Sequence, residues 1–393
     1  MNRRRFLHNS VIGPAAACAA PALAQAQTAK PARGKVSLRE KFFGCIAGVH
    51  VGSAMGAPCE SWTWQRIEEK HGTIDKLMPY LHYNNGWMRE AGTTEDGVER
   101  QKLMITAIIE KKDRVTAEDV RKIWVKYMLP EQAGMISEGF EGPLLQMAKS
   151  GIPACDIGRY CDYAGLNSFS RSCHPIGLIN AGDVEGAVAD VFEVGQLYQT
   201  SNSRGLQWAA VTAMAIAAAT KPAATVDSVI ATVLKGDPRF ASTAGSVKVV
   251  EELERNLELT KNCKDFRELR VVFDGVYSGS GMPYSYSSAN EVVTKAFCIF
   301  AMTKGITKDA MIAGVNIGRD TDCETAVAAG ISGALTGAGS IPAEWTKQVD
   351  YATSKMRVTN SRRTLREHAD GLYDAYLNRL RKARAFAEQM ERA

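Results

Sequence analysis

The sequence predicts an all-α protein in which one large domain spans residues 37–393. Apolar residues recur at helical spacing along most of the chain, and strand signals are few. No alternation of strands and helices appears, which argues against a parallel sheet. No internal repeat, low-complexity tract or linker is present either. We therefore expect roughly a dozen helices in a single bundle, with residues 61–90 as a long connection.

The composition is that of a globular protein without a nucleic-acid partner. Hydrophobic residues make up 45% of the chain and charged residues 23%, which is ordinary. The net charge is +5, and Arg3–Arg5 supply three of those charges, which leaves +2 for the chain beyond residue 26. A charge so close to neutral favours neither nucleic acid nor a membrane surface as a partner.

The first 26 residues are typical of a bacterial export signal. Arg3–Arg5 precede an Ala-rich apolar stretch, and Ala22–Ala26 contains two overlapping small-x-small cleavage sites. Residues 3–7 resemble the twin-arginine pattern R-R-x-F-L. The apolar stretch is short and broken by Pro14 and Pro21, so we expect no membrane anchor. The mature protein is expected in the periplasm or outside the cell.

Eight cysteines lie beyond the signal. Cys155, Cys161 and Cys173 are close together in sequence, but their spacing fits no zinc pattern. Buried thiols or one local disulfide are the two interpretations of this group.

The first long helix is predicted to begin near Ser37, with Glu40 three residues later as a capping box. Four glycines recur every four residues and so share one helical face: Gly44, Gly48, Gly52 and Gly56. Each weakens a helix by about 0.5–1 kcal/mol relative to Ala, so another backbone should lie against this face. Pro58 ends the helix, and Glu60 should emerge beside whatever the glycines touch.

A helix built largely of Ala and Gly is predicted to begin at two acids. Asp320 and Asp322 flank Thr321 at its start, where negative charge is favoured. Two acids held together inside a packed domain repel each other unless a cation offsets them, and hard cations take oxygen ligands. Plain N-capping by Asp320 or Thr321 explains the same residues without a metal. Both interpretations stay open at the level of the sequence.

Another acid cluster, Thr94-Glu95-Asp96, opens a mostly apolar helical stretch. Thr93 or Thr94 can cap this helix, and the two acids would fill its first turn. Together with the two preceding groups, the chain carries three acid clusters that begin or follow helices.

These stretches resemble, in the same order, the motifs of the ADP-ribosylglycohydrolase family. The family's opening pattern GxxxGxAxGDxxGxPxE corresponds to residues 44–60, which read GCIAGVHVGSAMGAPCE. Its Thr/Ser-Asp-Asp-Thr motif corresponds to residues 94–97, and GGDTDT with the following IPxxW corresponds to residues 318–345. A loop similar to NGxxMRxxPxG occupies residues 167–177. The likeness extends over residues 37–347.

This resemblance implies an all-α fold with a dinuclear metal cleft. Two divalent cations are expected, usually magnesium, with manganese or calcium also suited to oxygen ligands. Carried over position by position, the ligands would be Thr94, Glu95, Asp96, Asp320 and Asp322. The reaction implied is cleavage of a ribosyl bond through an oxocarbenium-like transition state. Catalysis is then expected from Glu60 and Asp96, and substrate contacts are expected from Gly56, Asn167 and Arg319.

The chain departs from the family pattern at several positions. Glu95 replaces an Asp, Gly97 and Cys323 each replace a Thr, Ser53 replaces an Asp and Arg319 replaces a Gly. One metal site is therefore expected to be altered. Three functions stay open: a glycohydrolase for ADP-ribose conjugates, an exported hydrolase for a nucleoside or sugar glycoside, and a non-catalytic ligand-binding homologue. In each case the partner would be a small-molecule or glycosyl substrate.

Overall fold

The computed structural model describes most of the chain, and the described part is almost entirely helical. It contains seventeen α-helices, α1–α17, and one two-stranded sheet. The all-α prediction is therefore confirmed, although the helices are more numerous than expected. The described residues are 36–82, 86–128, 141–161, 164–201, 203–240, 248–277 and 287–393. The export signal predicted for residues 1–26 lies outside them.

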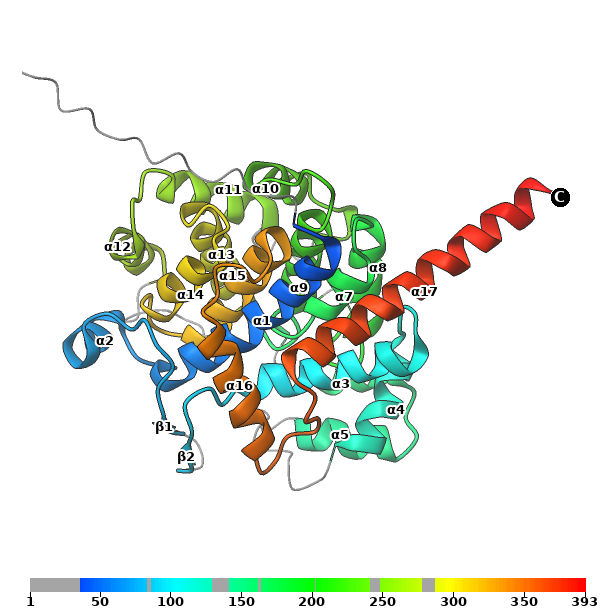
Figure 1. The fold of residues 1–393 in the computed structure, drawn as a ribbon, viewed down its shortest axis with the longest axis horizontal. Coiled ribbons are helices and arrows are strands. Elements are labelled where there is room, and N and C mark those ends of the chain that lie inside the picture. Colours follow the sequence, from blue (N-terminus) through cyan, green and yellow to red (C-terminus); the bar gives the residue numbers. More distant parts are fainter. Residues whose placement is uncertain are drawn as a thin grey trace, which may run out of the picture. The chain divides into compact units, whose positions relative to one another are not determined.

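Two helices rich in small residues form the centre of the domain: α1 (Leu38–Gly56) and α15 (Thr321–Thr336). They lie side by side (Figure 1). All four glycines of the predicted face meet the backbone of α15 or of the residue that ends it. A Cβ added to Gly48 would lie only 2.3 Å from the carbonyl oxygen of Ala329. The glycine face is thus a contact between two helices whose backbones touch.

Further helices cover both sides of this central pair (Figure 1). Those that pack on α15 are α9 (Arg204–Ala219), α13 (Ala289–Met302) and α14 (Thr307–Val315). Those that pack on α1 include α3 (Asp96–Lys111), α7 (His174–Ile179) and α17 (Leu365–Glu391). α9 is buried except at Arg204, as expected for a core helix. The last turns of α17, from Leu380 onward, are exposed.

The remaining helices are α2 (Trp64–His71), α4 (Ala117–Tyr127), α5 (Glu141–Lys149), α6 (Ala154–Ile157), α8 (Val184–Gly195), α10 (Val226–Leu234), α11 (Val249–Thr260), α12 (Phe266–Tyr277) and α16 (Ala343–Lys355). Short 3-10 helices occur as η1 (Ala57–Cys59), η3 (Gly158–Tyr160) and η4 (Pro238–Phe240). Strands β1 (Tyr80–Leu81) and β2 (Met88–Arg89) pair antiparallel.

Local sequence signals set several of these boundaries. The Ser37 hydroxyl accepts a hydrogen bond from the Glu40 backbone N–H at the start of α1, and Thr225 and Ser228 form a capping box at the start of α10. Residues 61–90 are more structured than predicted, because they contain α2 and the β1–β2 hairpin. The predicted threonine cap of α3 is wrong: Glu95 occupies the N-cap position and makes no side-chain capping bond.

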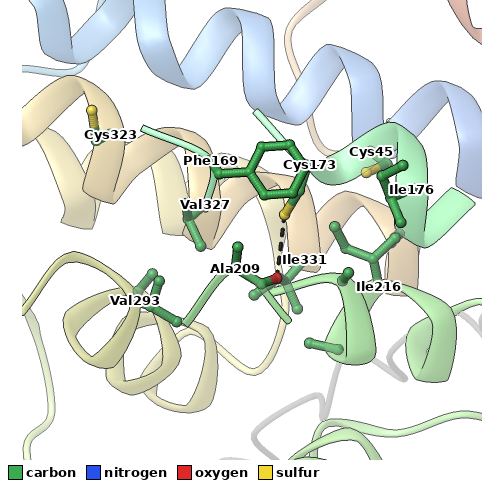
Figure 2. Packing of buried hydrophobic residues seen from close by; sticks show 14 of the residues in the cluster. Cys45, Phe169, Cys173, Ile176, Ala209, Ile216, Val293, Cys323, Val327 and Ile331 are labelled. Atoms are coloured by element: carbon green, nitrogen blue, oxygen red, sulfur yellow. Dashed lines mark hydrogen bonds between the residues drawn. The ribbon is translucent and has the colours of Figure 1, made fainter. Parts of the chain in front are cut away.

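One part of the apolar core lies between α15, α9, α13 and the segment that leads into α7. Phe169, Cys173, Val327 and Ile331 lie together there, and the Cys173 thiol donates to the Ala209 carbonyl at 3.3 Å (Figure 2). Burial raises the pKa of this thiol, which therefore stays neutral. Because Cys173 forms no disulfide, the buried-thiol interpretation holds for it.

α1 and η1 together, Leu38–Cys59, are long and apolar enough to cross a membrane. However, 89% of the most apolar 18-residue stretch of this segment is buried inside the protein. A helix that is apolar on all sides is also what a protein core requires, and the contact with α15 accounts for the composition here.

Candidate active site

The acid pair at the start of α15 is buried and does not cap the helix. Asp320 occupies the N-cap position but makes no capping bond, and its Oδ2 accepts from Asn167 Nδ2 at 2.7 Å. The Thr321 hydroxyl donates to the Gly56 carbonyl at 2.8 Å. The Oδ1 atoms of Asp320 and Asp322 are buried without a hydrogen-bond partner. N-capping therefore does not account for these residues, and the cation interpretation gains support.

The two carboxyl groups repel each other. Burial raises the pKa of Asp322 well above its usual range, and the charge of Asp320 raises it further. Burial also raises the pKa of Asp320. One oxygen of each acid and the sulfur of Cys323 all lie within 4.8 Å of one another. Such a group must hold either a proton or a cation.

Asp96, at the start of α3, is paired with two arginines. Its Oδ2 accepts from Arg171 Nη2 at 2.6 Å and from Arg100 Nη2 at 3.0 Å. Burial raises the pKa of this carboxyl, but the positive charges of Arg171 and Arg100 outweigh the burial, so the pKa lies below its usual range. Arg171 Nη1 also lies 3.2 Å from the sulfur of Cys323. Arg171 thus links the start of α3 to the start of α15.

Glu95 is held by the β1 hairpin region. The Tyr80 hydroxyl donates to its Oε1, and His82 Nε2 lies 3.2 Å from its Oε2. The Glu95 backbone N–H donates to the Ser53 hydroxyl of α1 at 3.3 Å. Both carboxylate oxygens of Glu95 therefore have partners, whereas the neighbouring Thr94 hydroxyl is buried without one.

Glu60 follows η1 and faces both acid clusters. Burial raises its pKa well above the usual range, and the charges of Asp322, Asp320, Glu95 and Asp96 raise it further. The contacts of Arg171 with Asp96 and Cys323 join the other two acid clusters, so the three clusters that the sequence singled out are neighbours in the fold.

The chain around Glu60 is tied to the chain before Asp320. The Ser61 backbone N–H donates to the Arg319 carbonyl at 2.7 Å, and the Arg319 N–H donates to the Trp62 carbonyl at 2.6 Å. Ser61 and Arg319 both adopt left-handed backbone conformations, with φ of 67° and 72°. This pairing holds Glu60 at a set distance from the acid pair.

The side chain of Arg319 anchors this loop. Its Nε and Nη2 donate to the two oxygens of Glu291 at 2.6 and 3.0 Å. Lys295 completes the buried network, with its Nζ 2.7 Å from Glu291 and 2.9 Å from Glu324. The resemblance placed Arg319 among substrate contacts, but in the structure these two donors are directed to Glu291.

The other two predicted substrate residues lie beside the acid pair. Gly56 is buried beneath it, and an added Cβ would meet the Thr321 carbonyl oxygen at 2.3 Å and Asp322 Cα at 2.5 Å. Its small size thus has a packing reason. Asn167 holds Asp320 through its amide nitrogen, while its Oδ1 is buried without a partner.

Sequence reasoning missed five side chains that surround the acids: Tyr80, His82, Arg100, Arg171 and Glu291. Arg171 lies inside the loop that resembled a family motif, which was the only available signal for it. The others lie on helices or a hairpin whose local pattern reveals no partner.

The donors at the acid pair fit a hard divalent cation. Two oxygens of the acid pair are buried without partners, Asp320 Oδ1 and Asp322 Oδ1, and the same is true of Asn167 Oδ1 and Thr94 Oγ1. Oxygen ligands of this kind suit magnesium, manganese or calcium. The other two predicted ligands, Glu95 and Asp96, differ because their carboxylate oxygens already have partners.

This all-α domain thus brings two buried, mutually repelling carboxylates at the start of α15 close to an arginine-paired carboxylate at the start of α3. The sequence profile described as ADP-ribosylglycohydrolase matches residues 34–382. The chain therefore belongs to the ADP-ribosylglycohydrolase family, and this membership supports a glycohydrolase-type function.

Two individual proteins illustrate the likeness. The chain is 24% identical to YegU, an uncharacterised protein of Escherichia coli (strain K12), over 316 residues that cover 77% of this chain and 89% of YegU. It is also similar to the solved structure of an ADP-ribosylglycohydrolase-related protein complex, with a TM-score of 0.60. That match covers 86% of this chain and 99% of the other at 14% identity, and so shows the fold alone.

Proposed function

We propose that this protein is a metal-dependent glycohydrolase that cleaves a ribosyl or related glycosidic bond, with ADP-ribose conjugates as the first candidate substrates. The observation that carries the proposal is the position of Glu60, which the backbone pairing of Ser61 with Arg319 holds next to the buried acid pair, where the neighbouring acids raise its pKa. Membership of the family supports a glycosyl bond as the target.

The roles of the residues follow from their surroundings. A bound divalent cation would polarise a water and the sugar hydroxyls, and Asp320 and Asp322 would hold it. Glu60 accepts the proton of the attacking water, because a carboxylate with a raised pKa is a stronger base. Asp96 stays ionised beside its arginines and fixes their guanidinium groups at the site. The free Oδ1 of Asn167 can accept from a sugar hydroxyl.

A second candidate is hydrolysis of a nucleoside or sugar glycoside by an exported enzyme. It is favoured by residues 1–26, whose pattern is that of a twin-arginine signal, because an exported enzyme meets a different set of glycosides. We propose a periplasmic or secreted location on the same pattern. N-terminal sequencing of the protein from a periplasmic fraction should start after residue 24 or 26. Retention of Met1 on cytoplasmic protein would contradict export.

Turnover by the chelated and metal-reloaded protein tests the function. Substrates should include ADP-ribosyl-arginine, ADP-ribosyl-serine, nucleosides and nitrophenyl glycosides, each with magnesium, manganese or calcium. We expect hydrolysis of at least one ribosyl substrate, lost on chelation and restored by a divalent cation. The matched control for Glu60→Gln is Glu69→Gln on the exposed face of α2. Binding of ADP-ribose without turnover of any substrate would instead indicate a ligand-binding homologue.

A further inference from the structure

The two halves of the predicted dinuclear site differ in how their charges are balanced. At the start of α15, Asp320 and Asp322 each keep one buried oxygen without a partner. At the start of α3, both oxygens of Asp96 accept hydrogen bonds, one from the Gly97 backbone N–H at 2.8 Å and one from two arginines. The need for a cation is thus confined to one half.

The side chain of Arg171 passes over Gly97 on its way to Asp96. A Cβ added to Gly97 would lie 2.8 Å from Arg171 Cδ and 3.0 Å from its Cγ. The family motif has Thr at this position, and a Thr side chain would collide with the stem of Arg171 as it lies here. The glycine at position 97, which lacks the threonine hydroxyl of the family motif, and the Arg171 guanidinium beside Asp96 therefore depend on each other.

Cys323 supports the same arrangement. The family motif has Thr at this position, whose hydroxyl suits a hard cation, whereas sulfur suits soft metals. Here the sulfur lies 3.2 Å from Arg171 Nη1. The two positions that lost a hydroxyl thus both lie against the side chain of Arg171.

We propose that the guanidinium of Arg171, with Arg100 beside it, takes the place of one of the two cations, so that the chain binds a single divalent ion at Asp320 and Asp322. The two arginines bring two positive charges to Asp96, equal to the charge of one divalent ion. A second ion at Asp96 would have to displace them or lie against them, and like charges in a buried site repel strongly. This inference rests on the metal dependence proposed above.

Counting bound manganese in the wild-type protein tests the proposal without an activity assay. Calorimetry should give one ion per chain, and electron paramagnetic resonance should show the six-line spectrum of an isolated manganese ion. Asp322→Asn should remove that ion. Two ions per chain with the spectrum of a coupled pair, or no ion at all, would overturn the proposal.

Restoring the two family threonines and removing the guanidinium of Arg171 should create the second site. The triple variant Gly97→Thr, Arg171→Ala, Cys323→Thr is expected to bind two manganese ions with a coupled spectrum. Arg384→Ala, on the exposed end of α17, is the control and should bind one. A folded triple variant that still bound one ion would also count against a guanidinium in the second site. If the variant fails to fold, the wild-type count decides.

The same measurements separate this inference from the proposed function. One ion without turnover of any glycoside would leave the single-ion site standing and reject the glycohydrolase. Two ions with turnover would reject the single-ion site and leave the glycohydrolase standing.

Discussion

Replacing single glycines of α1 with alanine should show that protein stability and metal affinity depend on different ends of this helix. One end of α1 packs on the end of α15, and the other end packs on the start of α15, where the acid pair lies. At one end, a Cβ on Gly44 would lie 2.5 Å from the carbonyl oxygen of Gly333. At the other end, a Cβ on Gly56 would lie 2.3 Å from the Thr321 carbonyl oxygen and 2.5 Å from Asp322 Cα. Both changes press backbone on backbone, but only the second moves the acid pair.

The expected magnitudes follow from these distances. Ordinary contact begins at 3.4 Å, so α1 and α15 must separate by about 1 Å in either variant. Overpacking typically costs about 1–3 kcal/mol, and no flexible side chain can yield here. The better helix propensity of alanine returns about 0.5–1 kcal/mol. We expect Gly44→Ala and Gly56→Ala each to lower the free energy of unfolding by about 1–2 kcal/mol.

Metal affinity should distinguish the two variants. In Gly56→Ala the displaced Asp322 should weaken manganese binding by at least about tenfold, which is about 1.4 kcal/mol. In Gly44→Ala the affinity should stay that of the wild type, because the acid pair is at the opposite end of α1.

Urea denaturation and manganese calorimetry provide both readouts. The control is Gly275→Ala on the exposed side of α12, where an added Cβ meets nothing within 4 Å. It should raise the free energy of unfolding by about 0.4–1 kcal/mol. Equal stability of Gly44→Ala and Gly275→Ala would refute the close helix contact. Equal manganese affinity in Gly44→Ala and Gly56→Ala would refute the link between the glycine face and the acid pair.

Three further predictions concern the site and the core. Glu60→Gln should keep the metal but lower turnover by about 10²–10⁴-fold, as expected for loss of a general base; turnover within a few-fold of wild type would reject that role. Asp320→Ala and Asp322→Ala should each abolish calorimetric binding of magnesium, manganese and calcium while circular dichroism shows an intact fold; unchanged affinity in both would remove the metal interpretation. His50 and His174 are buried and uncharged, and burial lowers the pKa of each from 6.5 to about 3. Because only the unfolded chain takes up these protons between the two values, stability should fall as the pH drops below about 6.5, by up to about 2.7 kcal/mol per pH unit for the two groups. Urea titrations at several pH values measure this slope, and a flat profile from about pH 6.5 to pH 5 would contradict it.

The sequence by itself determined the helical class and the central helix contact. Both follow from spacing within short windows: apolar residues at helical periods, and four glycines at intervals of four in α1. It also identified four acids that lie near one another in the fold, Glu60, Asp96, Asp320 and Asp322, because the motifs that contain them match the family patterns in order along the chain. Periodicity and short motifs depend only on residues that are close together in the sequence.

Only the tertiary structure decided what each carboxylate faces. Asp96 meets Arg171 across 75 residues, and Arg171 meets Cys323 across 152. Glu95 is bound by Tyr80 and His82, although the sequence makes it a ligand as readily as Asp320. An acid has the same local pattern whether it faces a metal, a guanidinium or a hydroxyl. Its partner depends on how distant helices pack, and that packing is settled by the whole chain and not by any short window of it.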